Sequence, residues 1–296
     1  MLKISEILAF LREEEIPFIF DGDETVTVEG FSSLTHYKPG SFTWIKTQKN
    51  IPENFDLIQI RLAFISEEVE GEYANSIKTS QSKKAFFSTI EHFYGLQSEK
   101  PAIGQFTYIS PEVKLGKNVR IGHNCTLDGN ITIGDNTVIW NNVVIINQVS
   151  IGHDCEIQSG TVIGHDGFAY TEDENHTKTM VKHYGGVEIG DNVYIGADVI
   201  VDRAQIDRTM ICAGCKIDPL VHIAHNVVLG KNSTVIACAN IMGSVSTGEN
   251  AYISSSTVRN QIKIGSNAVV GMGAVVVKNV PDNTTVVGNP AKVFEK

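Results

Sequence analysis

Residues 115–164 of the chain read LGKNVRIGHNCTLDGNITIGDNTVIWNNVVIINQVSIGHDCEIQSGTVIG, with an aliphatic side chain at every sixth position. Glycine often follows the aliphatic residue, and a small or β-branched residue often comes four places after it. A period this short and regular is the signature of stacked units that share one core. The spacing holds without a break at Ile103, Ile109, Leu115, Ile121, Leu127, Ile133, Ile139, Ile145, Ile151, Ile157 and Ile163.

Strand geometry explains the spacing. Side chains alternate between the two faces of a strand, so a six-residue unit keeps one face on a core only if the chain bends within the unit. Glycine can supply the backbone angles for such a bend. Three sides close one triangular coil, and stacked coils align aliphatic side chains that each contribute about 1.5–3 kcal/mol when buried. We therefore expect a mainly β protein with a parallel β-helix over residues 99–280.

The period has two insertions, and one unit between Ile253 and Ile264 is shortened. The period stops after Ile163 and resumes at Ile189, and residues 165–186 between them are predicted to form a loop ejected from the β-helix. Long loops on a rigid scaffold commonly carry function. The period slips again after Val201. Turn residues then predict a short carboxyl-terminal tail over residues 281–296.

The amino-terminal part lacks the six-residue period. Residues 1–98 are predicted to form a small α/β domain, because helical and strand-like spacings alternate along them. The expected elements are a helix around residues 4–11, strands around residues 25–28, 41–45 and 62–65, and a second helix near residues 84–93, joined through residues 97–101 to the β-helix.

Composition narrows the possible partners. The net charge is -10 and basic residues are not clustered, which argues against a nucleic-acid partner. The short apolar stretch at residues 7–11 precedes Arg12 and acidic residues, so it does not read as a signal peptide. No apolar run is long enough to span a bilayer. These features predict a cytoplasmic protein.

The cysteines do not predict a disulfide framework or a metal site. Their number, five, is odd, and their spacing is not typical of secreted domains. Cys212 and Cys215 form a CxxC pair, but zinc would want two further ligands. Cys125, Cys155 and Cys215 occupy the small-residue position of the repeat, which favours a packing role.

Several short motifs stand out along the chain. They are Gln158–Gly164, Asp166-Gly-Phe168, Val201-Asp-Arg203, Ile217-Asp218 and Ile223-Ala-His-Asn226, with Asp21-Gly-Asp23 and Val28-Glu-Gly30 near the amino terminus. These motifs resemble the hexapeptide-repeat acyltransferase superfamily, and more specifically the UDP-3-O-acylglucosamine N-acyltransferases of lipid A synthesis. The resemblance implies a left-handed β-helix, although parallel crossovers are generally right-handed. It also implies a homotrimer with active sites between subunits, and a nucleotide-sugar-binding role for residues 1–98.

The resemblance implies that His225 is the catalytic base. Spacing alone does not select it, because His123, His153 and His165 occupy the same position of a hexad. A neutral imidazole suits the transfer, since its ordinary pKa is near working pH. Backbone N–H groups would stabilise the oxyanion, and no nucleophile motif suggests a covalent intermediate. The candidate substrate contacts are Trp44, His165, Asp166, Phe168, His183 and Asn226.

Some candidates have alternative interpretations. An Asp before glycine, such as Asp166, is equally often a turn former, and Trp44 is as readily a core residue. Asp202 and Arg203 either hold a phosphate or pair with each other. The family's second histidine falls on Gln261. The family's uracil-stacking pair of aromatics falls on Trp44 and Asn50, so one ring is missing.

The carboxyl-terminal residues bear on the acyl donor. Gly288, Asn289, Pro290 and Lys292 resemble the ending of coenzyme A-dependent sugar acetyltransferases. We therefore expect acyl-CoA as donor, the amine of a nucleotide-linked amino sugar as acceptor, and neither a metal nor a permanently bound cofactor. The acyl length, a UDP or dTDP sugar, and the position of the amine stay open.

Other functions stay open as alternatives. The first is the lipid A reaction itself, N-acylation of UDP-3-O-(3-hydroxyacyl)glucosamine from an acyl carrier protein. Another class is a zinc carbonic anhydrase on the same β-helix, whose metal would be held by histidines between subunits. The last is a non-catalytic solenoid subunit.

Overall fold

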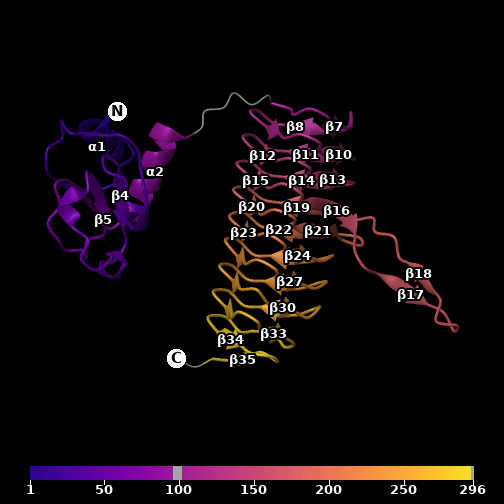
Figure 1. Ribbon diagram of the computed structural model, residues 1–296. Helices are drawn as coiled ribbons and strands as arrows, with labels where there is room; N and C mark the ends of the chain where they lie inside the picture. Colours follow the sequence, from indigo (N-terminus) through magenta and orange to yellow (C-terminus); the bar gives the residue numbers. More distant parts are fainter. Residues whose placement is uncertain (96–101, 295–296) are drawn as a thin grey trace. The chain divides into compact units, whose positions relative to one another are not determined.

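A computed structural model describes residues 1–95 and 102–294. The chain separates into two compact units, Met1–Glu99 and Lys100–Lys296, which are described separately below (Figure 1). The predicted connection at residues 97–101, and with it the expected boundary at residue 98, lies outside the described residues.

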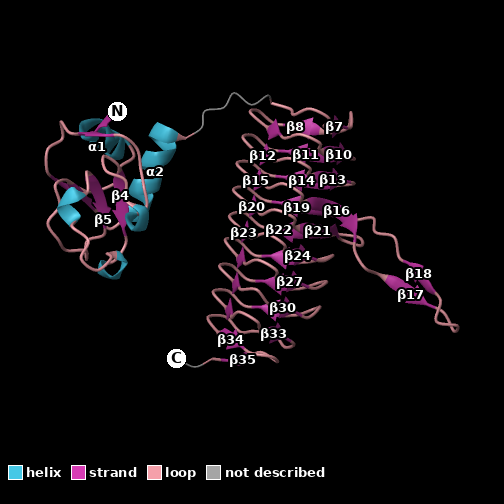
Figure 2. Ribbon diagram, viewed as in Figure 1, coloured by secondary structure: helices cyan, strands magenta, loops and turns pink. Residues whose placement is uncertain are grey.

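The second unit is a stack of short strands that form three parallel sheets, which we call faces 1, 2 and 3 (Figure 2). Successive strands pass from face 1 to face 2 to face 3, and each pairs with its counterpart one coil later. Face 1 contains β7 (Tyr108–Ile109), β10 (Thr126–Asp128), β13 (Val144–Ile146), β16 (Val162–Asp166), β21 (Ile200–Arg203), β24 (His222–Ile223), β27 (Asn240–Ile241), β30 (Thr257–Val258) and β33 (Val275–Val276).

The other two faces have the same construction. Face 2 contains β8 (Lys114–Leu115), β11 (Ile131–Ile133), β14 (Val149–Ile151), β19 (Gly186–Ile189), β22 (Arg208–Ile211), β25 (Val228–Leu229), β28 (Ser246–Thr247) and β31 (Lys263–Ile264). Face 3 contains β9 (Arg120–Ile121), β12 (Val138–Ile139), β15 (Glu156–Ile157), β20 (Tyr194–Ile195), β23 (Lys216–Ile217), β26 (Thr234–Val235), β29 (Tyr252–Ile253), β32 (Val269–Val270), β34 (Thr285–Val287) and β35 (Lys292–Val293).

Aliphatic ladders fill the interior of the stack. Residues at the sixth positions pair directly across the coils of face 1, and their side chains are fully buried. The prediction of a parallel β-helix is therefore confirmed. Ile103 and Leu115 are 46% and 38% exposed, because no earlier coil of the stack covers them. The face 1 ladder is Leu127, Ile145, Ile163, Val201, Ile223 and Ile241.

The glycines of the repeat serve close approach rather than the bend. The bend lies two residues later, usually at an asparagine in the left-handed region, such as Asn118 with φ 57° and Asn136 with φ 59°. Asparagine tolerates that conformation better than most residues. A Cβ on Gly116 would lie 2.7 Å from the backbone nitrogen of Asp135 in the next coil. Glycine is therefore needed where adjacent coils nearly touch.

The ejected segment is a hairpin that leaves the stack after β16 (Figure 1). β17 (Tyr170–Glu172) pairs with β18 (Lys178–Met180) in antiparallel fashion. The predicted limits of 165–186 are too wide: His165 and Asp166 stay in β16 and pair with β21, and Gly186 begins β19. A bulge between Ile163 and His165 shifts the register, which hides these pairs from a six-residue count.

The carboxyl-terminal boundary also differs from the prediction. β34 pairs with β32 and extends face 3 beyond residue 280, and β35 folds back on β34. Val286 pairs with Val270 and is 5% exposed. These two residues are 286 − 270 = 16 positions apart rather than eighteen, so the shortened coil breaks the period. The β-helix therefore continues into the segment that the sequence assigned to a tail.

The first unit is a small α/β fold. A four-stranded sheet has the order β2 (Ile19–Asp21), β6 (Ser76–Lys78), β5 (Leu62–Ile65) and β4 (Phe42–Ile45). α1 (Ile4–Glu13) and α2 (Ser82–Tyr94) share one apolar core with it, as Phe42, Phe64 and Phe86 are packed together. The remaining elements are β1 (Leu2–Lys3) paired with β3 (Thr27–Val28), and short 3-10 turns at Leu34–His36, Gln48–Asn50 and Leu57–Gln59.

Candidate active site

Both insertions into the repeat fall on one corner of the β-helix, the corner between face 1 and face 2. The hairpin segment, residues 167–185, follows β16, and the slip at residues 204–207 follows β21. His225 follows β24 at the same corner, one coil after the slip. We call this stretch, after β16, β21, β24 and β27, the interrupted corner. It combines the ejected hairpin with the predicted base.

Two glycines make room for the His225 ring. A Cβ on Gly243, one coil later, would lie 2.8 Å from both Cε1 and Nε2 of His225. A Cβ on Gly167, at the root of the hairpin, would lie 2.9 Å from Cδ2. A real Cβ at either place would displace the ring. Sequence reasoning missed both residues, although Gly243 occupies the hexad position of His225 one coil later.

Asn226 determines which nitrogen of His225 is free. His225 Nδ1 lies 3.0 Å from Asn226 Oδ1, and that oxygen also accepts the backbone N–H of Gln205 at 3.3 Å. Because an oxygen can only accept, Nδ1 carries the proton and Nε2 keeps its lone pair. Asn226 is itself held in the left-handed region, with φ 61°, and its N–H donates to Thr209 Oγ1. The sequence motif showed Asn226 but not Thr209.

Two side-chain contacts link neighbouring strands of face 1 at this corner. Arg203 Nε donates to Asp166 Oδ1 at 2.6 Å, and His222 Nε2 lies 3.1 Å from Asp202 Oδ2. Partial burial raises the pKa of Asp166, but hydrogen bonds from Arg203 and the His183 backbone outweigh it and lower that pKa below its ordinary value. Asp202 and Arg203 therefore pair with other residues, not with each other.

The hairpin forms one wall of a cavity at His225. Phe168 is 83% exposed, and its ring lies 4.8 Å from that of Tyr170. The structure brings Phe168 and His225 to the same cavity, whereas the exposed side chain of His165 stays on β16 outside its lining. The cavity has a volume of about 470 Å³ and is lined by Phe168, Ala169, Tyr170, Glu172, Lys178, Val181, Gln205 and His225.

His183, near the end of the hairpin segment, is buried. It is only 1% exposed, and its ring centre lies 5.5 Å from that of His225 with the planes at 79°. The structure therefore brings the two imidazoles together but leaves almost none of His183 accessible. Its Nδ1 lies 3.0 Å from the carbonyl of Val181.

Two of the other hexad histidines, His123 and His153, have a structural role. His123 Nδ1 accepts the backbone N–H of Gln105 at 2.8 Å, and His153 Nδ1 accepts that of Asp135 at 2.9 Å. Each imidazole thus binds the preceding coil at an uninterrupted corner. His225 makes no such bond in the described structure, which separates it from histidines at the same hexad position.

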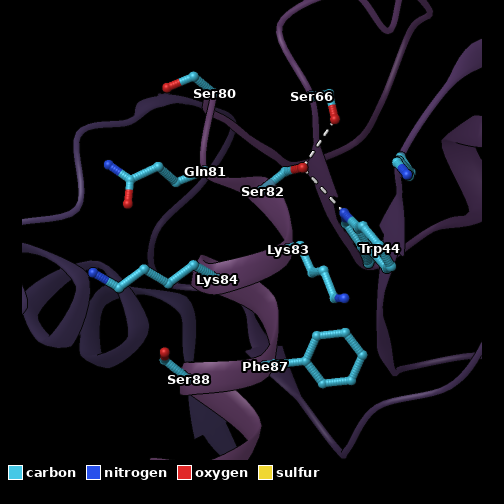
Figure 3. Close-up of a pocket in the computed structure, with 10 residues that line it drawn as sticks. Trp44, Ser66, Ser80, Gln81, Ser82, Lys83, Lys84, Phe87 and Ser88 are labelled. Carbon is cyan, nitrogen blue, oxygen red and sulfur yellow. Dashed lines mark hydrogen bonds between the residues drawn. The ribbon is translucent and has the colours of Figure 1, made fainter. Parts of the chain in front are cut away.

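Trp44 lies in a cavity of the first unit (Figure 3). Its Nε1 donates to Ser82 Oγ at 3.1 Å, and the ring of Phe87 lies 5.8 Å away, nearly perpendicular. Asn50 is not a second wall, because its side chain caps a turn by accepting from Thr47. The cavity, of about 570 Å³, is lined by Trp44, Lys46, Ser66, Ser80, Gln81, Ser82, Lys83, Lys84, Phe87 and Ser88. The sequence did not indicate Phe87, which comes from α2.

The carboxyl-terminal candidates lie further along the stack. Gly288, Asn289, Pro290 and Lys292 are exposed around the β34–β35 turn. The carbonyl of Gly288 accepts the N–H of Val275 in β33. β33 lies three strands beyond β24 on face 1, a separation of about 14 Å at ordinary strand spacing. These residues therefore do not contact His225.

Gln261 lies on the interrupted corner after β30 and is exposed. Its φ of 63° matches the 61° of Asn226 two coils earlier, so it occupies the turn position and not the position of His225. Its backbone N–H donates to the carbonyl of Gly243.

Three of the five cysteines pack inside the coil. Cys125, Cys155 and Cys215 are buried, and burial raises the pKa of Cys215 to about 11. Over residues 1–95 and 102–294, no three His, Cys, Asp or Glu side chains converge in a group that could hold a metal ion. The same residues include no helix of the length and hydropathy needed to cross a bilayer.

Family models match the repeat. The bacterial transferase hexapeptide model (six repeats) matches residues 130–165. The model for the hexapeptide repeat of succinyl-transferase matches residues 112–147 and 181–203. These matches cover the first coils and the stretch around the hairpin.

Two curated relatives illustrate the sequence similarity. The chain is 38% identical over 141 residues to a UDP-3-O-acylglucosamine N-acyltransferase of Wolinella succinogenes, covering 47% of this chain and 44% of the relative. It is 45% identical over 98 residues to the protein of that name from Coxiella burnetii, covering 33% and 29%. The matches therefore span less than half of the relatives' own length.

Solved structures share the fold. LpxA, a UDP-N-acetylglucosamine acyltransferase from Bacteroides fragilis, aligns with a TM-score of 0.59 at 26% identity, covering 67% of this chain and 74% of the other. LpxA from Acinetobacter baumannii aligns with a TM-score of 0.59 at 24% identity, covering 65% and 73%, and supports the fold alone.

Proposed function

We propose that this chain, a member of the hexapeptide-repeat acyltransferase superfamily, transfers an acyl group from a thioester to the amine of a nucleotide-linked amino sugar. The observation that carries the proposal is the His225 imidazole. Asn226 holds its Nδ1 proton, its Nε2 lone pair is unused, and its ring lines the cavity under the hairpin. A neutral imidazole in this state is a general base. The relatives named as N-acyltransferases support the same reaction class.

The reaction follows from this arrangement. The amine nitrogen attacks the thioester carbonyl, a C–N bond forms, and His225 Nε2 takes the proton that the amine loses. The resulting oxyanion is stabilised by backbone N–H groups of the corner. The C–S bond then breaks, and the proton on Nε2 passes to the departing thiolate. The products are an amide and a free thiol, and the enzyme returns to its starting state.

The cavity at Trp44 is the proposed nucleotide site. An indole and the Phe87 ring provide apolar walls for a base, and Lys46, Lys83 and Lys84 provide positive charge for phosphates. Lysine ammonium groups bind phosphate as point charges. Within the second unit, Phe168 in the hairpin segment and Asp166 in β16 are the candidate sugar contacts. His165 is a peripheral candidate.

The donor is proposed to be acyl-CoA, which runs along the β-helix from the turn at Gly288–Lys292 to His225. The separation of about 14 Å between β33 and β24 suits an extended thioester arm rather than direct contact. The lipid A variant, with an acyl carrier protein as donor, is the second candidate, and the name of the curated relatives supports its acceptor. Both versions imply a homotrimer with sites between subunits, which light scattering would test.

Ligand-dependent thermal unfolding tests the proposal. A ligand at one hundred times its Kd stabilises the folded state by about 2.7 kcal/mol. We expect UDP- or dTDP-linked amino sugars to raise Tm, with a further rise from acyl-CoA, and we expect Trp44→Ala to lose the first increment only. No increment from any of these ligands would favour a non-catalytic solenoid. Stoichiometric zinc in the purified protein would favour a carbonic anhydrase.

A further inference from the structure

His183 combines three properties that the proposed reaction has not yet used. It is 1% exposed, its ring packs edge to face against that of His225, and its Nε2 is buried without a hydrogen-bond partner in the described structure. Among the described residues, no other side-chain nitrogen is buried and unpaired. Buried polar atoms rarely lack a hydrogen-bond partner, and those that lack one often have a function.

The protonation state of His183 follows from its single bond. The Val181 carbonyl at 3.0 Å can only accept, so His183 Nδ1 carries a proton. A second proton on Nε2 would place an unpaired cation in a buried site, which is costly. With the proton on Nδ1, the Nε2 lone pair of His183 is unused in the described structure.

Hydrogen bonds at both ends of the hairpin segment fix the position of His183. Its backbone N–H donates to Asp166 Oδ2, and Asp166 is held by Arg203. The next residues bind the slip, since the N–H groups of Tyr184 and Gly185 donate to the carbonyl of Gln205. The same Gln205 donates to Asn226, the partner of His225. The two imidazoles thus belong to one connected hydrogen-bonded frame.

We propose that His183 is a positioning residue for His225, whose neutral ring and free lone pair favour the positive charge that His225 acquires during acyl transfer. The inference rests on the proposed function. A second imidazole with electron density to spare stabilises an adjacent imidazolium, while a cation in its place would oppose it. His183 touches neither substrate nor donor, so it acts only through His225.

Two substitutions separate charge stabilisation from packing. His183→Phe keeps a ring of similar size but removes the donor and the lone pair. His183→Gln removes the ring but restores an N–H for the Val181 carbonyl and an oxygen acceptor. We expect Phe to lower kcat about tenfold with KM within about twofold, and Gln to recover most of the loss. His176→Phe, at the exposed hairpin tip, is the control.

The pH–rate profile supplies a readout that packing does not move. In His183→Phe, the group that favours the positive charge on His225 is missing, so His225 is harder to protonate. The acid limb of the kcat profile therefore moves to lower pH, by about half a unit or more. The other charged groups near the two rings are unchanged in this variant: Asp166, Glu172, Lys178, Asp202, Arg203 and His222.

The same displacement is measurable without turnover. Following the His225 ring Cε1–H signal against pH by NMR, in wild type and His183→Phe, separates this inference from the proposed function. We expect the midpoint to move to lower pH in the variant even if no substrate is known. An unmoved midpoint, or a Phe variant as active as wild type while Gln is inactive, would overturn the inference.

Discussion

The corner that carries His153 and the interrupted corner that carries His225 are built from the same hexad, yet they use the same side chain differently. At His153 the coils follow one another without insertion, and Nδ1 accepts the N–H of Asp135. At His225 the neighbouring coils carry the hairpin and the slip, and Nδ1 is turned to Asn226 instead. The imidazole of His153 accepts a backbone N–H where the repeat is intact, whereas that of His225 donates to a side chain where the repeat is broken.

Removing each imidazole in turn should produce the largest difference between the two corners. His225→Ala is expected to lower kcat by about 10²–10⁴-fold, the usual contribution of a general base, with Tm nearly unchanged because no backbone group depends on it. His153→Ala is the matched control: it should lose about 1 kcal/mol of stability through the unpaired Asp135 N–H and keep its turnover. Equal turnover in the two variants would contradict the assignment.

Filling the space beside the ring should have the next largest effect. Gly243→Ala places a methyl group 2.8 Å from Nε2 of His225 and pushes the ring aside. A displacement on the order of 1 Å can cost about 10²-fold in rate. Met242→Ala, at the same turn but 40% exposed, should leave kcat unchanged. Steady-state kinetics and Tm are the measurements, and a fully active Gly243→Ala would show that the ring position does not matter.

Removing the side chain that accepts the Nδ1 proton of His225 should lower kcat by a smaller factor. Asn226→Gly keeps the left-handed turn but removes the acceptor that selects the reactive nitrogen. We expect kcat to fall about tenfold, equivalent to about 1.4 kcal/mol. Ser244→Gly changes the same turn position one coil later, with φ 60°, and should retain full activity. If both variants behave alike, the side chain of Asn226 does not orient the base.

The ion pair between Asp166 and Arg203 should give the smallest effect, a change in the free energy of unfolding. The folded pKa of Asp166 is below its ordinary value, so the folded chain binds fewer protons than the unfolded chain at acid pH. Its contribution is therefore full above about pH 4 and is lost as the pH falls through the folded pKa.

Unfolding of wild type and Asp166→Asn against pH tests this contribution. The gap between their unfolding free energies should be about 1 kcal/mol or less near neutral pH and should close on acidification. Glu188→Gln, which alters an exposed pair with Arg208, is the control and should show almost no gap. A gap that widens in acid would reverse the sign of the argument.

The ladder could be predicted from the sequence because burial repeats with the coil. Each sixth side chain faces the core, so Ile145 or Ile223 is visible as a period before any coordinates are known. Where the period fails, the spacing no longer indicates which side chains are buried. The bulge beside His165 and the short coil before Val286 therefore moved the predicted boundaries of the hairpin and of the β-helix.

The site was only partly predictable for a related reason. The motif around His225 indicated the proposed base, but the residues that contact this base are distant in the chain. Gly167, Thr209 and Gly243 matter through contacts of a few ångströms that no local pattern reveals. Phe87 faces Trp44 from a helix, where the family pattern expected a ring near Asn50. Such relations depend on tertiary packing.

The most direct test of the account is the identity of the acylated atom. Wild-type protein would be incubated with acyl-CoA and a nucleotide-linked sugar whose amine is labelled with ¹⁵N, and the product examined by NMR. We predict an amide proton coupled to ¹⁵N, with one equivalent of free thiol released. An ester on a sugar hydroxyl, with the ¹⁵N amine left free, would contradict it.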